Sequence, residues 1–365
     1  MKNNNYQQLT RTFQRLSRFS HLSSIASWDM FTMMPPGGSA ARGEALAEMS
    51  VLQHQILNDK KVGEWLAAAA EEDLNDVEQA NLREMTRHYQ QATLLPESLV
   101  EAKSLAGSRC EHAWRTQRPA NDWQGFSANL KEVVKLSREE ARLRAEAKGC
   151  TPYDALLDIF EPDMTSARLD VLFGDLKSWL PELLAKVVEK QAQRSFVPPQ
   201  GPFPTATQRV KPGYIRVDAD EVSYPAHVVL RYEIERALIN GEIEVDDIPA
   251  LWDEKMQAWL GLSTKDNYRN GCMQDIHWTD GGFGYFPSYT LGAMYAAQLF
   301  HAAKTALPGL QASIAGGDFS ALFDWLRQNI WQHGSRFSTS QLITQATGED
   351  LNIRYFREHL TSRYL

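Results

Sequence analysis

The stretch that decides the fold class lies near the start of the chain. Residues Tyr6 to Met34 read YQQLTRTFQRLSRFSHLSSIASWDMFTMM. Apolar side chains recur there every three or four residues, at Leu9, Phe13, Leu16, Phe19, Leu22 and Ile25. This spacing places them on one face of an α-helix. The pattern ends at Pro35-Pro36-Gly37-Gly38, because proline and glycine interrupt a helix.

The same periodicity continues along the chain and predicts an all-α, mainly helical protein. Further helices are expected over residues 42–57, 61–70, 76–95, 96–112, 121–148, 166–194, 224–240, 247–260, 290–306, 318–331, 338–347 and 351–364. Asp122 and Ser166 carry short oxygen side chains before periodic segments and are candidate N-caps. Tyr214 to Val217 is the best strand candidate.

A stretch rich in proline and glycine divides the chain. Pro198-Pro199-Gln200-Gly201-Pro202-Phe203-Pro204 cannot continue a helix. It predicts an N-terminal helical lobe over residues 1–204 and a C-terminal helical lobe over residues 205–365. The second lobe contains a glycine- and aromatic-rich loop, residues 271–289, that is suited to line a groove.

Composition excludes several classes of protein. The 365 residues include 43% hydrophobic and 23% charged residues, which excludes wholesale disorder. No apolar run approaches the roughly 20 residues of a membrane span. The net charge of −8 disfavours nucleic-acid binding, which requires clustered Lys and Arg. A start without an apolar signal segment, and an odd number of widely spaced cysteines, predict a cytoplasmic protein with reduced thiols.

The loop of residues 271–289 concentrates side chains that carry chemistry. Gln274, Asp275, His277, Tyr285 and Tyr289 can donate, accept or titrate, among glycines that permit close approach of a ligand and aromatic rings that wall a cleft. Histidine acts as acid, base or neutral donor, and tyrosine can donate to an oxyanion. The alternative is a structural loop in which Asp275 caps a turn and His277 is a core imidazole.

A second segment, Tyr214 to His227, contains a single arginine. Arg216 can hold a carboxylate through two parallel hydrogen bonds. The alternative is an ion pair with Asp218 or Asp220, and from the residues alone this alternative is the better supported.

These segments carry a resemblance to the thermostable carboxypeptidase family. Ile215-Arg216-Val217-Asp218-Ala219-Asp220 matches its Ile-Arg-x-x-Ala-Asp motif, and Gly271 to Trp278 matches its Gly-x-x-Gln-Asp-x-His-Trp motif. Ser27-Trp28-Asp29 and Asn352-Ile353-Arg354-Tyr355 extend the likeness to both ends of the chain. The resemblance implies two helical lobes flanking a groove, usually in a dimer. The activity it implies is metal-dependent removal of C-terminal amino acids from peptides.

The resemblance also implies roles for individual residues. Arg216 would recognise the terminal carboxylate of a peptide, with Gln274 and Asp275 as further substrate-binding residues. His277 and either Tyr285 or Tyr289 would stabilise the tetrahedral oxyanion. Asp275 would also orient the ring of His277.

The chain departs from the family at the metal site. Members of that family bind zinc, or another divalent metal, through a helical His-Glu-x-x-His pair and a later glutamate. None of the nine histidines here is followed by glutamate, and no two are four residues apart. The missing motifs would all fall between Pro204 and Val210, so the simplest account is one internal deletion. We therefore expect no metal ligand in this chain and an inactive or severely impaired enzyme.

Two other interpretations stay open. The chain could be a non-catalytic protein that holds peptide C-termini or dimerises with a full-length relative, or a spliced or engineered product without its own function. Loss of core helices would expose apolar faces that once packed against them, so we also expect a homodimer or other self-association.

Overall fold

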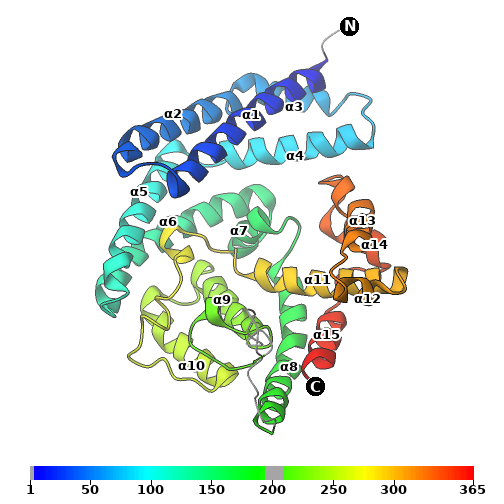
Figure 1. Ribbon diagram of the computed structural model, residues 1–365. Coiled ribbons are helices and arrows are strands. Elements are labelled where there is room, and N and C mark those ends of the chain that lie inside the picture. The colour runs from blue at the N-terminus through cyan, green and yellow to red at the C-terminus, as the bar shows by residue number, and fades with distance from the viewer. Residues whose placement is uncertain (1–3, 194–208) are drawn as a thin grey trace. The chain divides into compact units, whose positions relative to one another are not determined.

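The computed structural model describes residues 4–193 and 209–365. Within these ranges the chain is helical, with no β-strand (Figure 1). The expected all-α class is confirmed. The expected boundary between lobes, at residues 204 and 205, lies outside the described residues and stays a prediction. No helix in the described ranges is both long and apolar enough to cross a bilayer.

Contacts between Cα atoms divide the chain into two compact units. The first unit comprises Met1–Pro96 together with His333–Phe337, and the second comprises Glu97–Gln332 together with Ser338–Leu365. The second unit therefore takes residues from both sides of the expected lobe boundary, and it contains every candidate site residue.

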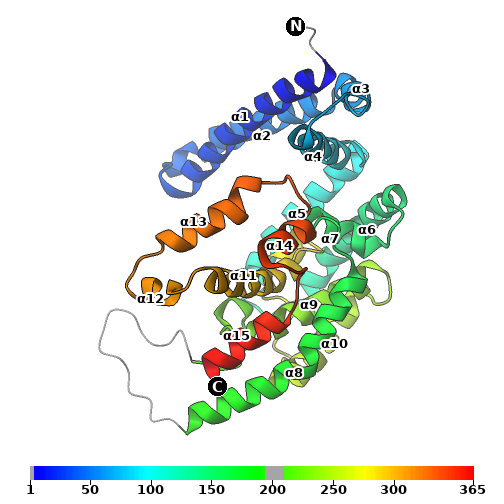
Figure 2. The same ribbon diagram turned by 90° about the vertical axis from the view of Figure 1, so that its right-hand side faces the viewer.

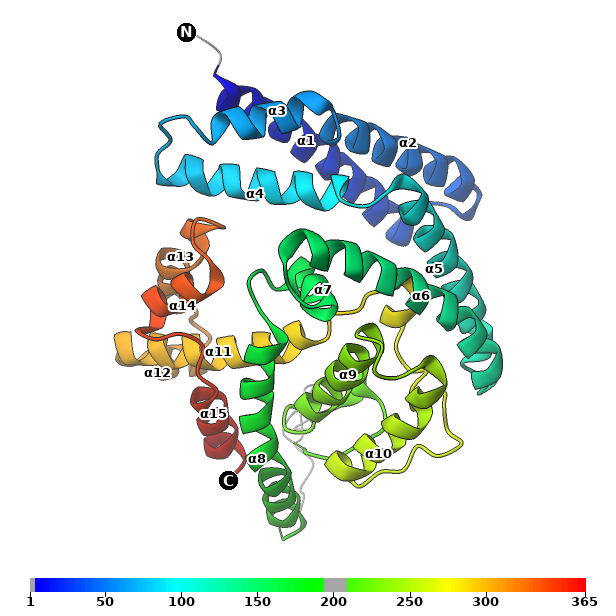
Figure 3. The same ribbon diagram turned by 180° about the vertical axis from the view of Figure 1, so that it is seen from behind.

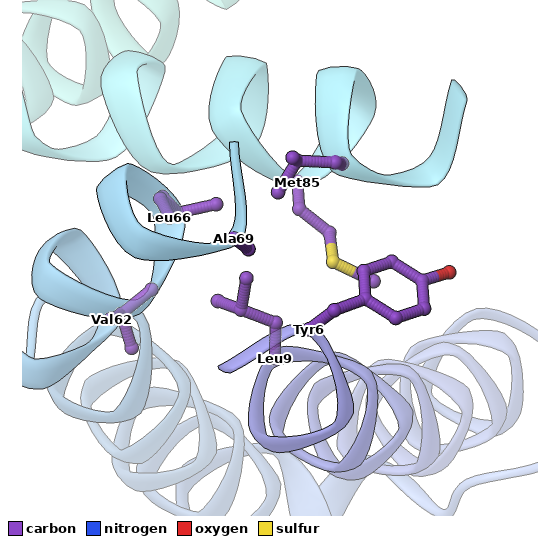
Figure 4. Close-up of a cluster of buried hydrophobic side chains, with 7 residues drawn as sticks. Tyr6, Leu9, Val62, Leu66, Ala69 and Met85 are labelled. Atoms are coloured by element: carbon purple, nitrogen blue, oxygen red, sulfur yellow. The ribbon is translucent and has the colours of Figure 1, made fainter. Parts of the chain in front are cut away.

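The first unit is a bundle of four helices. They are α1 (Asn5–Thr32), α2 (Ser39–Leu57), α3 (Lys60–Ala69) and α4 (Asp76–Thr93), with the 3₁₀ turn η1 (Pro36–Gly38) between α1 and α2. Figure 4 shows Tyr6 and Leu9 of α1 pointing toward Val62 and Leu66 of α3 and toward Met85 of α4. Full burial of such a side chain contributes about 1.5–3 kcal/mol, so this cluster holds the bundle together.

The second unit contains the remaining helices. They are α5 (Glu97–Gln117), α6 (Trp123–Lys148), α7 (Pro152–Phe160), α8 (Ser166–Ala192), η3 (Arg216–Asp218), α9 (Tyr224–Ile239), η4 (Val245–Asp247), α10 (Ile248–Leu260), η5 (His277–Asp280), α11 (Pro287–Ala306), α12 (Leu310–Ala315), α13 (Ser320–Asn329), α14 (Thr339–Thr347) and α15 (Arg354–Tyr364). The turn η6 (Trp331–His333) has residues in both units. Figure 3 shows α10 beside α9, and Figure 2 shows α14 and α15 beside α11.

Helix α9 lies at the centre of the second unit, and most of its side chains are buried. The ring of Tyr232 meets Tyr153 of α7 edge-on, with centroids 5.7 Å apart, and Phe173 of α8, with centroids 5.2 Å apart. Edge-to-face pairs of this kind add about 0.5–1.5 kcal/mol beyond the burial of their area. Helix α9 is thus closely packed on most sides, and its polar side chains are enclosed by neighbouring helices.

The structure differs locally from the sequence expectations. The expected strand at Tyr214 to Val217 is wrong, because Arg216–Asp218 forms the 3₁₀ turn η3. Helix α7, which the periodicity did not predict, begins with Pro152 after the N-cap Thr151. Asp122 is confirmed as an N-cap, since its carboxylate accepts the Gly125 N–H, but Thr165 caps α8 in place of Ser166.

Candidate functional site

The two motif-bearing segments, far apart in sequence, are joined through one amide side chain. Oε1 of Gln274 accepts the backbone N–H of Arg216 at 2.7 Å. Its Nε2 donates to the carbonyl oxygens of Tyr214 at 2.9 Å and Asn270 at 2.8 Å. Gln274 therefore fixes the backbone next to Arg216. Its expected role in binding substrate stays a prediction.

A buried ion triad lies beside this junction. Oδ1 of Asp275 accepts from Nε of Arg216 at 3.0 Å, and Oδ2 accepts from Nε of Arg231 at 2.6 Å. Arg231 comes from α9, is fully buried and lies 4.5 Å above the ring of Trp252. Arg216 thus pairs with Asp275, whereas the alternative expected an ion pair with Asp218 or Asp220.

The triad carries one net positive charge, because two guanidiniums share one carboxylate. Burial opposes ionisation of Asp275, but the two arginines outweigh it and lower the pKa of this carboxyl. Burial also lowers the pKa of Arg231, and the attraction of Asp275 offsets that effect only in part. The Arg216 guanidinium also donates to the hydroxyl of Tyr224 at 2.9 Å and lies 5.1 Å from the ring centroid of Tyr289. Such a site favours an anion.

His277 and the two candidate tyrosines form an aromatic wall next to Arg216. Nε2 of His277 shares a 3.3 Å hydrogen bond with the hydroxyl of Tyr289, and its ring stacks on Tyr285 with centroids 5.6 Å apart. Burial lowers the pKa of His277. Burial and the neighbouring Tyr285 hydroxyl raise the pKa of Tyr289 to about 12. At neutral pH both are therefore uncharged groups that form hydrogen bonds.

Asp275 does not orient the ring of His277, and that expectation is wrong. Both oxygens of Asp275 accept hydrogen bonds from guanidinium groups. Nδ1 of His277 is buried and has no hydrogen-bond partner among the described residues. The ring is positioned by its aromatic neighbours, which include Phe286 at 4.7 Å between centroids.

Glu235 of α9 accepts hydrogen bonds from the loop of residues 271–289. The carboxylate accepts from the Tyr153 hydroxyl at 2.6 Å, from Nε1 of Trp278 at 3.1 Å and from the Gly284 N–H at 3.2 Å. Gly284 has φ +89°, and a Cβ there would lie 2.8 Å from the backbone nitrogen of Leu157, so only glycine fits this close approach.

The sequence-based predictions missed both Arg231 and Glu235. These residues lie four and eight positions after the buried His227 and share its helix face. This i, i+4, i+8 spacing of polar residues is the signal that could have identified them.

The burial of Glu235 predicts a measurable pH dependence. Burial raises its pKa from 4.5 to about 7, despite the three hydrogen bonds. The unfolded chain therefore ionises this group first, and its contribution to stability is lost as pH rises from about 4.5 to about 7. We expect the free energy of unfolding of Glu235→Gln, relative to the wild type, to increase by on the order of 3 kcal/mol across that range.

Urea unfolding at a series of pH values measures this difference. Glu242→Gln, at an exposed glutamate just beyond the end of α9, is the matched control and should show a constant difference from the wild type. A difference that is constant across the range for Glu235→Gln as well would contradict the assignment.

The acidic and imidazole groups of the site do not suit a zinc ion. No three His, Cys, Asp or Glu side chains in residues 4–193 and 209–365 gather in a way that could hold a metal. The oxygens of Asp275 are engaged by two guanidiniums. His227 is fully buried, and burial together with the charge of Arg231 lowers its pKa to about 3. A cation placed beside two arginines would be repelled.

Comparison with known proteins places this helical chain among the metallopeptidases. The family model for "Carboxypeptidase Taq (M32) metallopeptidase" matches residues 8–209 and 199–364, and the chain belongs to this family. Thermostable carboxypeptidase 1 of Thermus thermophilus is 29% identical over 501 aligned positions, covering 98% of each chain. Carboxypeptidase 1 of Bacillus subtilis is 26% identical, covering 96% of each chain.

Solved structures agree with this assignment. Metallocarboxypeptidase 1 of Trypanosoma cruzi matches with a TM-score of 0.95 and 35% identity over 99% of each chain. The carboxypeptidase of Pyrococcus furiosus shares the fold, with a TM-score of 0.91 at 23% identity. The Thermus alignment has 501 positions and this chain has 365 residues, so at least 136 positions (501 minus 365) lie opposite gaps in this chain.

Proposed function

We propose that this chain is a carboxypeptidase-family protein that binds peptide C-termini and does not hydrolyse them. The observation that carries the proposal is the net positive charge of the buried triad Arg216–Asp275–Arg231. One guanidinium charge has no carboxylate of its own there, and the terminal carboxylate of a peptide would supply one. The family assignment supports a peptide as the ligand.

Loss of hydrolysis is inferred from the sequence. No His-Glu-x-x-His motif is present, and the family match consists of two pieces that overlap over residues 199–209. The unmatched positions of the longer relatives can be accommodated where these pieces overlap, which is also where the family's metal-ligand motifs are expected to be missing. Water activation in this family depends on that metal. We therefore propose that zinc is not a cofactor of this chain.

The remaining residues would hold the end of a peptide. The guanidinium of Arg216 would pair with the terminal carboxylate. The hydroxyls of Tyr285 and Tyr289 and the neutral imidazole of His277 would form hydrogen bonds with the last peptide group. Among these residues His277 and Tyr289 already share a hydrogen bond, which keeps both oriented for a ligand.

Peptide binding that survives removal of metal is the expected result. In fluorescence anisotropy with dansyl-Ala-Leu, addition of EDTA should leave the affinity unchanged, and Arg216→Ala should weaken it at least about tenfold through loss of a charge-assisted pair. Dansyl-Ala-Leu-amide, which lacks the carboxylate, is the matched control ligand and should bind weakly to the wild type.

Two outcomes would contradict the proposal. Equal binding of the acid and the amide would show that the carboxylate is not recognised. Binding lost on chelation would show that a metal holds the peptide. Circular dichroism of Arg216→Ala checks that this variant keeps the fold.

Assembly and location extend the proposal. We propose that this protein is cytoplasmic. We also propose that it forms a homodimer or pairs with a full-length relative. Exposed apolar side chains support self-association: Leu22, Ile25 and Trp28 of α1 are exposed, and so is Met33 just after the end of that helix.

A further inference from the structure

The start of the chain carries a charge opposite to that of the rest. Residues 1–28 contain no aspartate or glutamate, and Asp29 is the first acid of the chain. Their basic residues are Lys2, Arg11, Arg15 and Arg18. The rest of the chain therefore holds 34 of the 38 lysines and arginines and all 46 acids, a net charge of −12. A positive segment on an acidic protein can bind an anionic partner, because the local field depends on the nearest charges.

The three arginines lie on an exposed face of α1 that becomes apolar further along the helix. Positions 11, 15, 18, 22 and 25 have the spacing i, i+4, i+7, i+11 and i+14, which places their side chains in one stripe. Leu9, which packs in the bundle core, lies on the opposite side of the helix. The stripe is exposed, and so are two side chains beside its C-terminal end. We call these seven residues the α1 face: Arg11, Arg15, Arg18, Leu22, Ile25, Trp28 and Met33.

The arginines of the α1 face have no acidic partner. Among residues 4–193 and 209–365, none of the three forms an ion pair with a carboxylate. Asp29, the acid nearest to them in sequence, pairs with Arg42 of α2 at 2.8 Å. The Arg15 guanidinium lies over the ring of Phe19, 5.4 Å from its centroid. Three guanidinium groups on one helix face are therefore available to an anion, and phosphate is a group that arginine binds well.

The other end of the α1 face exposes large apolar side chains. Trp28 is 61% exposed and Met33 is 72% exposed. Leu22 and Ile25 lie directly beside them and are also exposed. Apolar side chains that are exposed singly are normal, whereas a group of them marks an interaction surface. Tryptophan in addition favours the boundary between hydrocarbon and water, because its ring is apolar and its N–H is polar.

A bilayer with anionic headgroups fits both ends of the α1 face. Nucleic acid would neutralise the arginines and leave the apolar end in water, whereas a bilayer presents phosphates and hydrocarbon directly beneath them. Arg15 and Ile25 are separated by about 15 Å along the helix axis, at 1.5 Å per residue. A tilt of roughly 30° would place Ile25 about 8 Å deeper than Arg15, within the about 5–10 Å to which interfacial helices are buried.

We propose that the α1 face docks the chain onto an anionic phospholipid surface without crossing it. The guanidinium groups pair with lipid phosphates, and the apolar end enters the outer part of the acyl layer. This inference goes beyond the proposed function and does not depend on it. The α1 face belongs to the first unit, and the residues proposed to hold a peptide belong to the second.

Co-sedimentation with lipid vesicles measures the docking. The wild-type chain should partition at least about tenfold more strongly onto vesicles of mixed phosphatidylcholine and phosphatidylglycerol than onto phosphatidylcholine alone, and added salt should weaken the binding. Lipids with brominated acyl chains should quench tryptophan fluorescence in the bound protein. Trp28→Phe, which keeps an apolar ring at this position, should lose most of that quenching.

Charge-reversed variants test the location. Arg15→Glu/Arg18→Glu should weaken the partition at least about tenfold, because each reversal replaces attraction by repulsion. Lys60→Glu/Lys61→Glu is the matched control, since it makes the same change in net charge at two exposed positions of α3 in the same unit. It should alter the partition by no more than about threefold, because salt screens distant charges. Circular dichroism checks that both variants keep their helices.

A third variant tests the apolar end without a change of charge. Leu22→Gln/Ile25→Gln replaces two exposed apolar side chains and should also weaken the partition onto anionic vesicles. Light scattering of the same variant without lipid shows whether these side chains hold two copies together.

Several results would overturn the inference. Equal partition onto neutral and anionic vesicles would do so, and so would equal losses in the two charge-reversed variants. Binding of poly-L-glutamate without binding of vesicles would assign the α1 face to an acidic polypeptide. A homodimer that dissociates in Leu22→Gln/Ile25→Gln, with no binding of vesicles, would assign it to a second copy. Peptide binding is measured separately with dansyl-Ala-Leu, so none of these results decides the proposed function.

Discussion

The purified chain, supplied with zinc or cobalt, is expected to release no free amino acid from a blocked dipeptide above the uncatalysed rate. Peptide hydrolysis by metallopeptidases depends on a cation that polarises the scissile carbonyl and lowers the pKa of a bound water. Enzymes of any class gain at least about 10⁶-fold from such effects, so the loss should be of that order or larger. Here the sequence supplies no His-Glu-x-x-His pair.

A ninhydrin or mass-spectrometric assay of the released amino acid measures this result. A family member that carries the complete motif, assayed in the same buffer, is the positive control. Turnover by this chain that depends on added metal and disappears with a chelator would contradict the prediction.

Asp275→Asn is expected to destabilise the fold by about 3–5 kcal/mol. The substitution leaves two guanidiniums, one of them fully buried, without the carboxylate that accepts hydrogen bonds from both. Removing one partner of a buried ion group costs this much because a charge is left uncompensated. Urea unfolding at neutral pH, followed by circular dichroism, measures the change.

The matched control is Asp218→Asn, which lies on an exposed turn two residues from Arg216. It should change the free energy of unfolding by no more than about 0.5 kcal/mol, as is usual for a surface site. Similar losses in the two variants would mean that the triad does not hold the site together.

The stability that Asp275 contributes should also disappear as pH falls below about 3.9, because its pKa is lowered in the folded state.

Much of the fold follows from the periodicity of the sequence. Apolar residues spaced as in Leu9 and Phe13 predict helices, and helices are what the described residues form. Short elements were harder to predict. Helix α7 has nine residues, too few for a clear period, and its start depends on Thr151 and Pro152. The turn at Arg216 looks extended in sequence because residues of a 3₁₀ turn carry no distinct pattern.

The sequence predicted which residues come together at the candidate site better than it predicted their hydrogen-bond partners. The sequence motifs predicted that Arg216, Gln274, Asp275 and His277 matter, and the structure brings all four together. Their hydrogen-bond and ion-pair partners depend on which face of α9 packs against the loop of residues 271–289. Arg231 and Glu235 are therefore visible only once that helix is placed, because a polar residue on an amphipathic helix is normally expected in solvent.

The most direct test of the central claim is the metal content of the chain purified without chelators, measured by inductively coupled plasma mass spectrometry. The account predicts far less than one zinc, cobalt or other transition-metal ion per chain, both as isolated and after incubation with zinc followed by gel filtration. One tightly held ion per chain, retained through gel filtration, would contradict it.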